Sequence, residues 1–417
     1  MRPNGYVSVV WMVALVAAIG CGSSSQSNTP PPTGLSKRVL LSNQFSSTVN
    51  LLNGQKDTFT TKTFGAPGAG KMVTANGQTI VLDGTQNDIT VIDNTKEVVS
   101  FSIALDDQPV DIAITSDGAV AFAAERNLGE VRFGTTVDGA LNPTILHVPA
   151  ARRLVMSPKG TKLLVFSDPQ SGTGINSIFV IDTASKGIAV ITSSHFDQPF
   201  TAVFGTSETQ AFVLNCGPQC GGTTASVVSV DFSNVLASPA GPANFSNNAS
   251  VAGATAGLLN GSTLFVAGTP PQPPATVAGC PLSRCGVLTA IDTTSMTPGN
   301  SVPITDGVHG KMAMTTTGRI YIGASGCTVD PGSAPNTVRG CLSIFNVSTA
   351  ATKFPEESSF RQNFDVTGLQ PISNRSVIYV VQAGELDIFD TTADAIASNI
   401  TQLDVIGEAI DVLQIDP

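Results

Sequence analysis

A short phrase that looks like a β-strand running into a turn recurs along the chain, and it constrains the fold more than any other feature. Its clearest copy is Ile178–Thr183, an apolar run that stops at an Asp-Thr pair. Four or five strand-forming residues followed by a turn former are typical of a β-strand entering a tight turn. The other copies end at the following positions: Asn53, Asp93, Asp231, Asp292, Asn346 and Asp390, with a degenerate copy at Gly134.

The spacing of this column predicts a repeat architecture. Residues 53, 93, 134, 182, 231, 292, 346 and 390 are separated by 40, 41, 48, 49, 61, 54 and 44 positions. A period of roughly 40–50 residues is typical of β-propellers, in which each repeat forms one blade. Eight copies predict eight blades; the alternative is seven, with the copy near Gly134 or Asp231 miscounted.

A second phrase precedes the first within each period. Pro109–Gly118 alternates apolar and polar residues, turns at Asp-Gly and continues into Val120–Phe122. Similar pairs occur at Leu154–Phe166 and Met312–Ile322. Each repeat therefore reads as strand a, a hairpin turn, strand b, a loop, strand c ending at the Asp/Asn column, a turn, and an outer strand d.

The two ends of the repeat region are complementary. Arg38–Leu41 reads as strand b with no strand a before it, and Ile410–Ile415 reads as strand a with no strand b after it. We expect Ile410–Ile415 to pair with the first blade, because closure of the ring removes the open sheet edges that invite aggregation. The expected fold is all-β, a propeller of four-stranded antiparallel blades closed by this strand.

These phrases resemble the YVTN-type, lactonase-like β-propeller repeats of bacterial and archaeal surface proteins. The resemblance covers about residues 37–417 and is strongest around Asp93 and Asp182, whereas the Tyr-Val-x-Asn element is replaced, for example by Phe212–Asn215. It implies the propeller fold. It does not select a function, because this fold hosts lactonases, lyases, dehydrogenase subunits and binding proteins.

The N-terminus has the form of an export signal. Arg2 precedes an uncharged apolar run, Tyr6–Gly20, which is too short to span a bilayer. The run ends at Ala18-Ile19-Gly20-Cys21, which resembles a bacterial lipobox and implies lipidation of Cys21; an ordinary signal peptide is the alternative. We expect a lipoprotein signal peptide at 1–20, a flexible Ser/Thr/Pro tether at 21–36 and one propeller domain at 37–417, anchored in the outer membrane on a side that the sequence does not indicate.

Six further cysteines fall in local pairs, each inside a b–c connection. An exported chain with even, locally paired cysteines predicts three disulfides, which join Cys216 to Cys220, Cys280 to Cys285 and Cys327 to Cys341. The alternative is a zinc site that uses the first four of these cysteines.

In propellers the b–c and d–a connections emerge on one face, which we call the loop face. Three long connections on consecutive blades, Asn215–Thr224, Gly268–Gly286 and Gly326–Gly340, are expected there. Rigid loops on a scaffold are common binding surfaces, although plain surface insertions are an equal alternative.

Candidate catalytic residues are few. His147, His195 and His309 lie at or near d–a connections, as do Asp197 and further acids at Asp106, Asp107, Asp306 and Asp365. A His–carboxylate cluster over the channel is suited to acid–base chemistry or to metal binding. Solvated histidines and acids that cap turns are the simpler interpretation, and we expect the Asp/Asn column itself to cap turns.

The charge composition of the chain argues against nucleic acid as a binding partner. The chain has a net charge of −10, with 21 basic and 31 acidic residues among 417, so it lacks the basic character that nucleic-acid binding needs. We expect no cofactor, no metal and no nucleic acid, a monomer, and membrane attachment through the lipid alone. The leading hypothesis is a non-catalytic scaffold that binds an envelope protein or other ligand on the loop face; the alternative is a lactonase- or lyase-like enzyme with a His/Asp site at the channel mouth.

Overall fold

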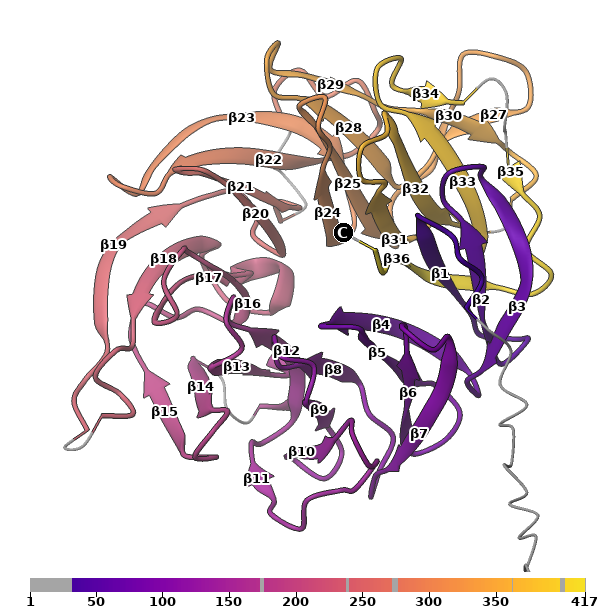
Figure 1. The fold of residues 1–417 in the computed structure, drawn as a ribbon. Coiled ribbons are helices and arrows are strands. Elements are labelled where there is room, and N and C mark those ends of the chain that lie inside the picture. The colour runs from indigo at the N-terminus through magenta and orange to yellow at the C-terminus, as the bar shows by residue number, and fades with distance from the viewer. Residues whose placement is uncertain are drawn as a thin grey trace, which may run out of the picture. The chain divides into compact units, whose positions relative to one another are not determined.

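The computed structural model is built mainly of four-stranded antiparallel sheets, whose strands in most cases follow one another in the chain (Figure 1). The structure describes residues 32–172, 176–237, 240–271, 277–361, 363–397 and 402–416. The predicted signal peptide and Cys21 lie outside these residues. Pro32–Pro417 is a unit of its own and is described by itself.

The first four blades each contribute one inner strand, two central strands and one outer strand. Their bounds are, for blade 1, β36 (Ala409–Gln414), β1 (Arg38–Asn43), β2 (Thr48–Asn53) and β3 (Thr58–Gly65); for blade 2, β4 (Ala69–Ala75), β5 (Gln78–Asp83), β6 (Asp88–Asp93) and β7 (Val98–Ala104); for blade 3, β8 (Asp111–Ile114), β9 (Val120–Glu125), β10 (Glu130–Thr135) and β11 (Leu146–His147); for blade 4, β12 (Ala151–Met156), β13 (Lys162–Ser167), β14 (Ser177–Asp182) and β15 (Ile188–Thr192).

The second four blades repeat this order. Their bounds are, for blade 5, β16 (Pro199–Phe204), β17 (Gln210–Asn215), β18 (Ser226–Asp231) and β19 (Asn244–Ser250); for blade 6, β20 (Ala256–Asn260), β21 (Thr263–Gly268), β22 (Cys285–Asp292) and β23 (Thr297–Thr305); for blade 7, β24 (Val308–Met314), β25 (Arg319–Ser325), β28 (Leu342–Asn346) and β29 (Ala351–Lys353); for blade 8, β31 (Val366–Pro371), β32 (Val377–Gln382), β33 (Glu385–Asp390) and β34 (Ala395–Ile396), with β35 (Gln402–Leu403) also paired to β33.

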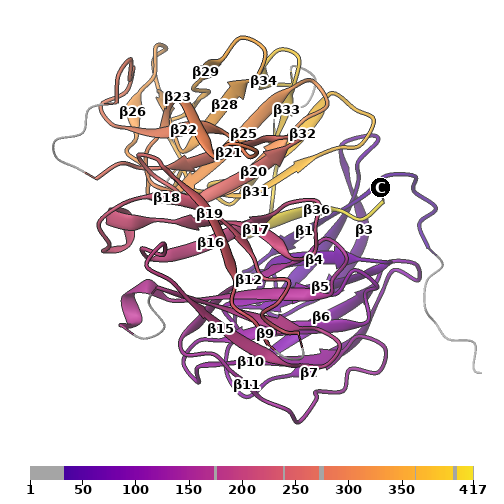
Figure 2. The ribbon, with the colours of Figure 1, turned by 90° about the vertical axis from the view of Figure 1, so that its left-hand side faces the viewer.

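The eight inner strands lie side by side around a closed circuit in the order β36, β4, β8, β12, β16, β20, β24, β31 and back to β36. Eight blades in the described residues confirm the predicted number over the alternative of seven. The predicted closure is also confirmed. Strand β36 pairs antiparallel with β1, with Leu40 opposite Leu413 and Leu41 opposite Val412, and Figures 1 and 2 both show the two strands together.

The hydrophobic core lies between neighbouring blades. One cluster joins Phe122 and Val131 of blade 3 to Leu163 and Val165 of blade 4, and all four side chains are fully buried. Because every blade is covered by a neighbour on both sides, its central strands bury both faces. This explains why strands b and c read as continuous apolar runs instead of alternating.

The Asp/Asn column ends the c strands and caps the turns that follow, as predicted. The Asp182 carboxylate accepts hydrogen bonds from the backbone N–H groups of Ala184 and Ser185, at 3.1 and 2.7 Å. An Asx side chain that accepts from the N–H groups two and three residues further on holds the chain in a turn. The same arrangement occurs at Asn53, Asp93, Asp292, Asn346 and Asp390.

One expected loop contains regular structure. Within Gly326–Gly340, β26 (Asp330–Pro331) and β27 (Thr337–Arg339) form a hairpin, and β30 (Glu356–Ser358) adds to it as a third strand. Strands of two or three residues are too short to give a periodic sequence signal. Two 3-10 turns, Pro169–Ser171 and Gly217–Cys220, complete the assigned elements. None of the described helices is long and apolar enough to cross a membrane.

Candidate functional site

Three disulfides pin three of the b–c connections on the loop face. The structure bonds Cys216 to Cys220, Cys280 to Cys285 and Cys327 to Cys341. These are the predicted pairs, and they belong to consecutive blades 5, 6 and 7. Because the six sulfurs form three disulfide bonds, the cysteines have no free thiolate to bind a metal, and the alternative of a zinc site built on four of them is wrong.

The d–a connection that leads into blade 5, between β15 and β16, holds the blade 5 loop in place. One carboxylate oxygen of Asp197 accepts hydrogen bonds from the N–H groups of Thr223 and Thr224, at 2.8 and 2.7 Å, and from the Thr223 hydroxyl at 2.5 Å. These bonds outweigh burial, which acts to raise the pKa, and the pKa of Asp197 is lowered. Asp197 is therefore an ionised anchor of the loop.

Glycine is required where this loop turns back on itself. Gly217 has a φ of 53°, in the left-handed region, and a Cβ there would lie 2.3 Å from the backbone N of Ala225. Any other side chain at this position meets backbone that cannot move without shifting strand β18. The tight path of the loop thus depends on this residue as well as on the Cys216–Cys220 bond.

The pinned loops of blades 5 and 6 are bonded to each other and to the d–a connection before blade 7. Gln219 donates to the Gly307 carbonyl at 2.9 Å and accepts from the Thr269 N–H at 3.1 Å. The Thr269 hydroxyl donates to the same carbonyl at 2.7 Å. Three segments from three blades therefore meet around one glutamine side chain.

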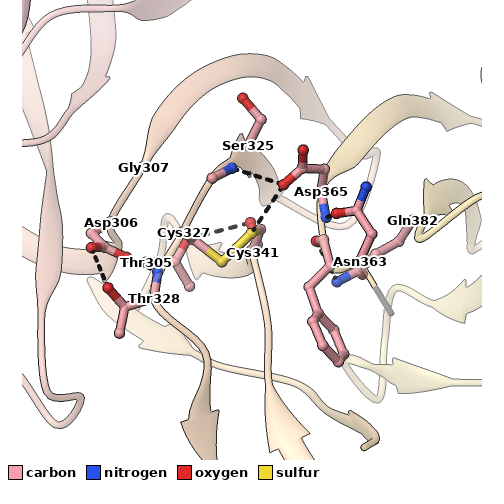
Figure 3. The surroundings of a disulfide bond; sticks show 12 residues. Thr305, Asp306, Gly307, Ser325, Cys327, Thr328, Cys341, Asn363, Asp365 and Gln382 are labelled. Atoms are coloured by element: carbon pink, nitrogen blue, oxygen red, sulfur yellow. Dashed lines mark hydrogen bonds between the residues drawn. A yellow bond between two sulfur atoms is a disulfide. The ribbon is translucent and has the colours of Figure 1, made fainter. Parts of the chain in front are cut away.

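The loops of blades 6 and 7 are joined in the same way. The Ser283 N–H donates to the Asp330 carboxylate at 3.0 Å, and Arg284 lies 3.5 Å from Asp306. Asp306 also accepts from the Thr328 N–H at 2.6 Å, next to the third disulfide (Figure 3). These bonds extend the connected surface across all three blades.

Asp365 continues the connection to blade 8. Its carboxylate accepts from the Gly326 N–H at 2.7 Å, beside the Cys327–Cys341 bond (Figure 3). The three pinned loops, with the acids Asp197, Asp306 and Asp365 that hold them, thus form one hydrogen-bonded surface. We call this surface the stapled ridge.

The predicted histidine cluster does not form. His309 lies in the inner strand β24, not in a connection, and is fully buried, with Nε2 bonded to the Thr305 carbonyl at 2.9 Å. Burial lowers its pKa to about 4, against the opposing effects of this hydrogen bond and of Asp306. His309 is a neutral core residue.

The other two histidines lie apart from any catalytic arrangement. His147 is exposed on the outer strand β11, and His195 is exposed and stacks on Phe245 with ring centroids 5.4 Å apart. In the described residues, no hydrogen bond or ion pair joins any two of His147, His195, Asp197 and His309. Phe245 belongs to β19, which long loops separate from His195 in the sequence, so this stacking had no sequence signal.

An acidic group on blade 3 involves one of the acids that the sequence singled out. Carboxylate oxygens of Asp106, Glu125 and Glu130 lie within 4.8 Å of one another. Arg132 lies 2.6 Å from Asp106 and 3.6 Å from Glu130. Burial, with Glu130 acting in the same direction, raises the pKa of Glu125 to about 7, although the N–H groups of Asp106 and Asp107 lower it. The Arg132 guanidinium and the raised pKa of Glu125 offset part of this negative charge.

A basic cavity of about 580 Å³ occupies the loop-face end of the central channel. Its lining comes from the inner strands of five blades and from Arg126 in the connection after β9. The basic residues of the lining are Lys71, Arg126, Arg152, Arg153 and Lys311. We call it the channel mouth. These residues are scattered over 240 positions of a chain with net negative charge, so composition and motifs gave no sign of them.

A second cavity of about 560 Å³ lies on the loop face where blades 8 and 1 meet. It is lined by the aromatic rings of Phe45 and Phe360, which are 76% and 81% exposed, with Ile406 beside it at 93%. Large apolar side chains that are exposed together at one place mark interaction surfaces more often than single exposed ones do. We call these three residues the apolar patch.

Comparison with known proteins identifies the fold and nothing narrower. No protein-family model matches the chain, and no curated protein matches its sequence. Dihydro-heme d1 dehydrogenase NirN, solved in complex with DHE, is similar with a TM-score of 0.67 and 10% identity, over 93% of this chain and 78% of that one.

Two further solved structures are similar. Hydrazine synthase of Kuenenia stuttgartiensis has a TM-score of 0.56 and 15% identity, over 79% of this chain and 97% of that one. A functionally unknown protein of Desulfotomaculum acetoxidans has a TM-score of 0.53 and 12% identity, over 92% of this chain and all of that one. At these identities the likeness shows a shared β-propeller architecture alone.

Proposed function

We propose that this chain is a non-catalytic scaffold that binds a partner protein of the cell envelope through its loop face. The observation that carries the proposal is the stapled ridge, in which three disulfide-pinned loops of consecutive blades are bonded to one another. A surface already held in one conformation loses little entropy when a partner binds, so contacts made there translate efficiently into affinity.

The apolar patch supports a protein as the partner. Phe45, Phe360 and Ile406 present their side chains to solvent on the same face as the stapled ridge. Exposed aromatic and aliphatic groups beside a cavity favour the insertion of apolar side chains from another protein. Together, the ridge and the patch extend the proposed surface from blade 5 round to blade 1.

The proposed location follows from cysteine chemistry and from the N-terminal sequence. Three disulfides favour an oxidising compartment outside the cytoplasm. The lipobox-like Ala18–Cys21 favours a lipid anchor at Cys21, and the repeats favour the YVTN type of propeller. In this proposal the propeller is held at the outer membrane by its lipid, with the loop face free to meet a partner.

The geometry favours this role over a lactonase- or lyase-like enzyme. Of the four candidates for catalysis, Asp197 anchors the Thr223–Thr224 backbone and His309 packs in the core. His147 and His195 stand exposed. General acid–base catalysis needs two such groups within hydrogen-bond reach of one substrate, an arrangement that these positions do not provide.

The test is a cross-linking pull-down from envelope fractions with the full-length chain. A double variant, Arg284→Glu with Phe360→Ser, changes the stapled ridge and the apolar patch. The matched control is Val137→Ser, which removes a 75% exposed apolar side chain from a c–d turn on the opposite face. We expect one protein to be enriched by the native chain and the control, and to fall about tenfold or more with the double variant.

Two results would count against the proposal. One is that every captured protein is recovered equally with the double variant. The other is hydrolysis of a lactone by the native chain that is lost on His195→Ala, because this would favour the enzyme.

A further inference from the structure

Backbone irregularities bring basic side chains to the channel mouth. Strand β12 has a register shift between Ala151 and Arg153, and β24 has one between His309 and Lys311. A third shift lies between Ala69 and Met72 of β4, around Lys71. A β-bulge inserts an extra residue and re-aims the neighbouring side chains, which is why bulges gather next to functional sites. The same shift occurs in β16, between Pro199 and Thr201, and in β31, between Val366 and Gly368, so five of the eight inner strands carry it at this end. In β4, β12 and β24 the shifted stretch holds a basic residue of the channel mouth.

Arg153 is the residue at the channel mouth without a counter-ion. Its guanidinium lies 4.2 Å from the centre of the Phe200 ring, and in the described residues no carboxylate pairs with it. Loss of contact with water on burial lowers the pKa of Arg153; the Asp111 carboxylate opposes this, and the adjacent Arg152 adds to it. The Phe200 ring is a weaker partner for this guanidinium than an oxyanion, so a bound anion would stabilise the charged side chain further.

The other four basic residues share too few carboxylates to be neutralised. Lys71 pairs with Asp111, Lys311 pairs with Asp411 at 2.9 Å, and Arg126 and Arg152 both pair with Asp168. Five cations therefore meet three carboxylates, which leaves two positive charges in the mouth.

Two of these carboxylates also accept hydrogen bonds from backbone N–H groups of the neighbouring blade. Asp111 accepts from the Leu154 N–H at 2.8 Å, and Asp411 accepts from the Met72 N–H at 3.0 Å. Each carboxylate thus links its own inner strand to the next blade. Their role in joining blades explains why these acids are present, whereas among the described residues the surplus cations are met only by the Phe200 ring, over which Arg152 and Arg153 lie.

We propose that the channel mouth binds a small polyanion carrying phosphate or carboxylate groups. Guanidinium groups match the planar geometry of both oxyanions, and lysines add point charge around them. The cavity, at about 580 Å³, is of the size that small-molecule ligands occupy. A cleft with an excess of positive charge also concentrates anions near an acidic protein that otherwise repels them. This site is separate from the stapled ridge and does not depend on the proposed partner.

The test is isothermal titration calorimetry of the full-length chain in a phosphate-free buffer at low salt, with inorganic pyrophosphate and citrate as separate probes. We compare Arg153→Gln and Lys71→Gln with Lys56→Gln, which removes the same charge from an exposed c–d turn on the opposite face. Circular dichroism verifies that each variant is folded, and two channel variants keep the test decisive if one is not.

We expect saturable binding of one probe at one site per chain. Affinity should fall about tenfold or more in Arg153→Gln and Lys71→Gln, remain within about twofold in Lys56→Gln, and weaken as salt rises. Preference for pyrophosphate or for citrate identifies the phosphate or carboxylate class. The proposal is overturned if neither probe binds at millimolar concentration, or if the channel variants bind as well as Lys56→Gln does.

Discussion

Leu41 of β1 lies directly opposite Val412 of β36, and both side chains are buried in the core between blades 8 and 1. Because the two strands come from distant parts of the chain, this one pairing turns a row of blades into a ring. It also places Asp411 where it pairs with Lys311 and accepts from the Met72 N–H. The closure strand thus supports both the fold and the channel mouth.

Removal of residues 409–417 should leave the propeller open. Strand β1 would then expose an unpaired edge and Leu41 would lose its cover, so we expect loss of the cooperative unfolding transition and concentration-dependent aggregation. Adding a synthetic peptide of residues 405–417 should restore the transition by strand addition, and a scrambled peptide should not. Differential scanning calorimetry measures both. An unchanged melting temperature after truncation would contradict closure by β36.

The turn caps can be tested at Asp390, whose carboxylate accepts from the Thr392 and Ala393 N–H groups at 2.7 and 3.2 Å. Asp390→Ala should lower the free energy of unfolding by about 1 kcal/mol, because it leaves these donors without a side-chain acceptor. Asp390→Asn keeps a carbonyl oxygen at the same place and should recover most of the loss. Urea denaturation gives both values; equal losses would show that the cap is not the cause.

Stability should depend on pH through Glu125, whose pKa rises to about 7 through burial and through Glu130. In the unfolded chain its pKa is near 4.5, so between these values the folded state binds more protons than the unfolded state. The contribution of this group is therefore present below pH 4.5 and is lost as the pH rises toward 7. We expect Glu125→Gln to reduce the drop in unfolding free energy between pH 5 and pH 8. If the unfolding free energy of Glu125→Gln falls as much as that of the native chain, groups other than Glu125 cause the pH dependence.

A disulfide should stabilise the fold more when it closes a longer loop, although the gain rises only with the logarithm of the loop length. Cys327–Cys341 spans 14 residues and Cys216–Cys220 spans 4. From chain entropy, the double Cys→Ser change at 327 and 341 should cost about 3 kcal/mol, and that at 216 and 220 about 2 kcal/mol. Urea denaturation under non-reducing conditions measures both, and the reverse order would show that strain or packing outweighs loop closure.

Much of the fold was predictable because its signals are local. The Asp/Asn column marks the ends of c strands through turns that each involve only a few neighbouring residues. The closure followed from counting strands at Arg38–Leu41 and Ile410–Ile415. The cysteine pairs were also readable, since each lies within one connection.

The features that build the site are not local, which is why the sequence did not reveal them. Gln219 and Gly307 are 88 positions apart, and their hydrogen bond depends on the blades around them. Register shifts beside Lys71, Arg153 and Lys311 are set by how inner strands pack, so residue types alone do not locate them. The histidines misled for the same reason: the burial of His309 is decided by its neighbours on other strands.

The central claim is that the loop face is the surface on which a partner binds. Site-specific photo-crosslinking in the producing organism tests it most directly, with a photoreactive amino acid placed at position 360 on the loop face or at position 137 on the opposite face of the full-length chain. The account predicts a discrete adduct with one protein from position 360 and none from position 137. Adducts from position 137 alone, equal adducts from both positions, or none from either would contradict it.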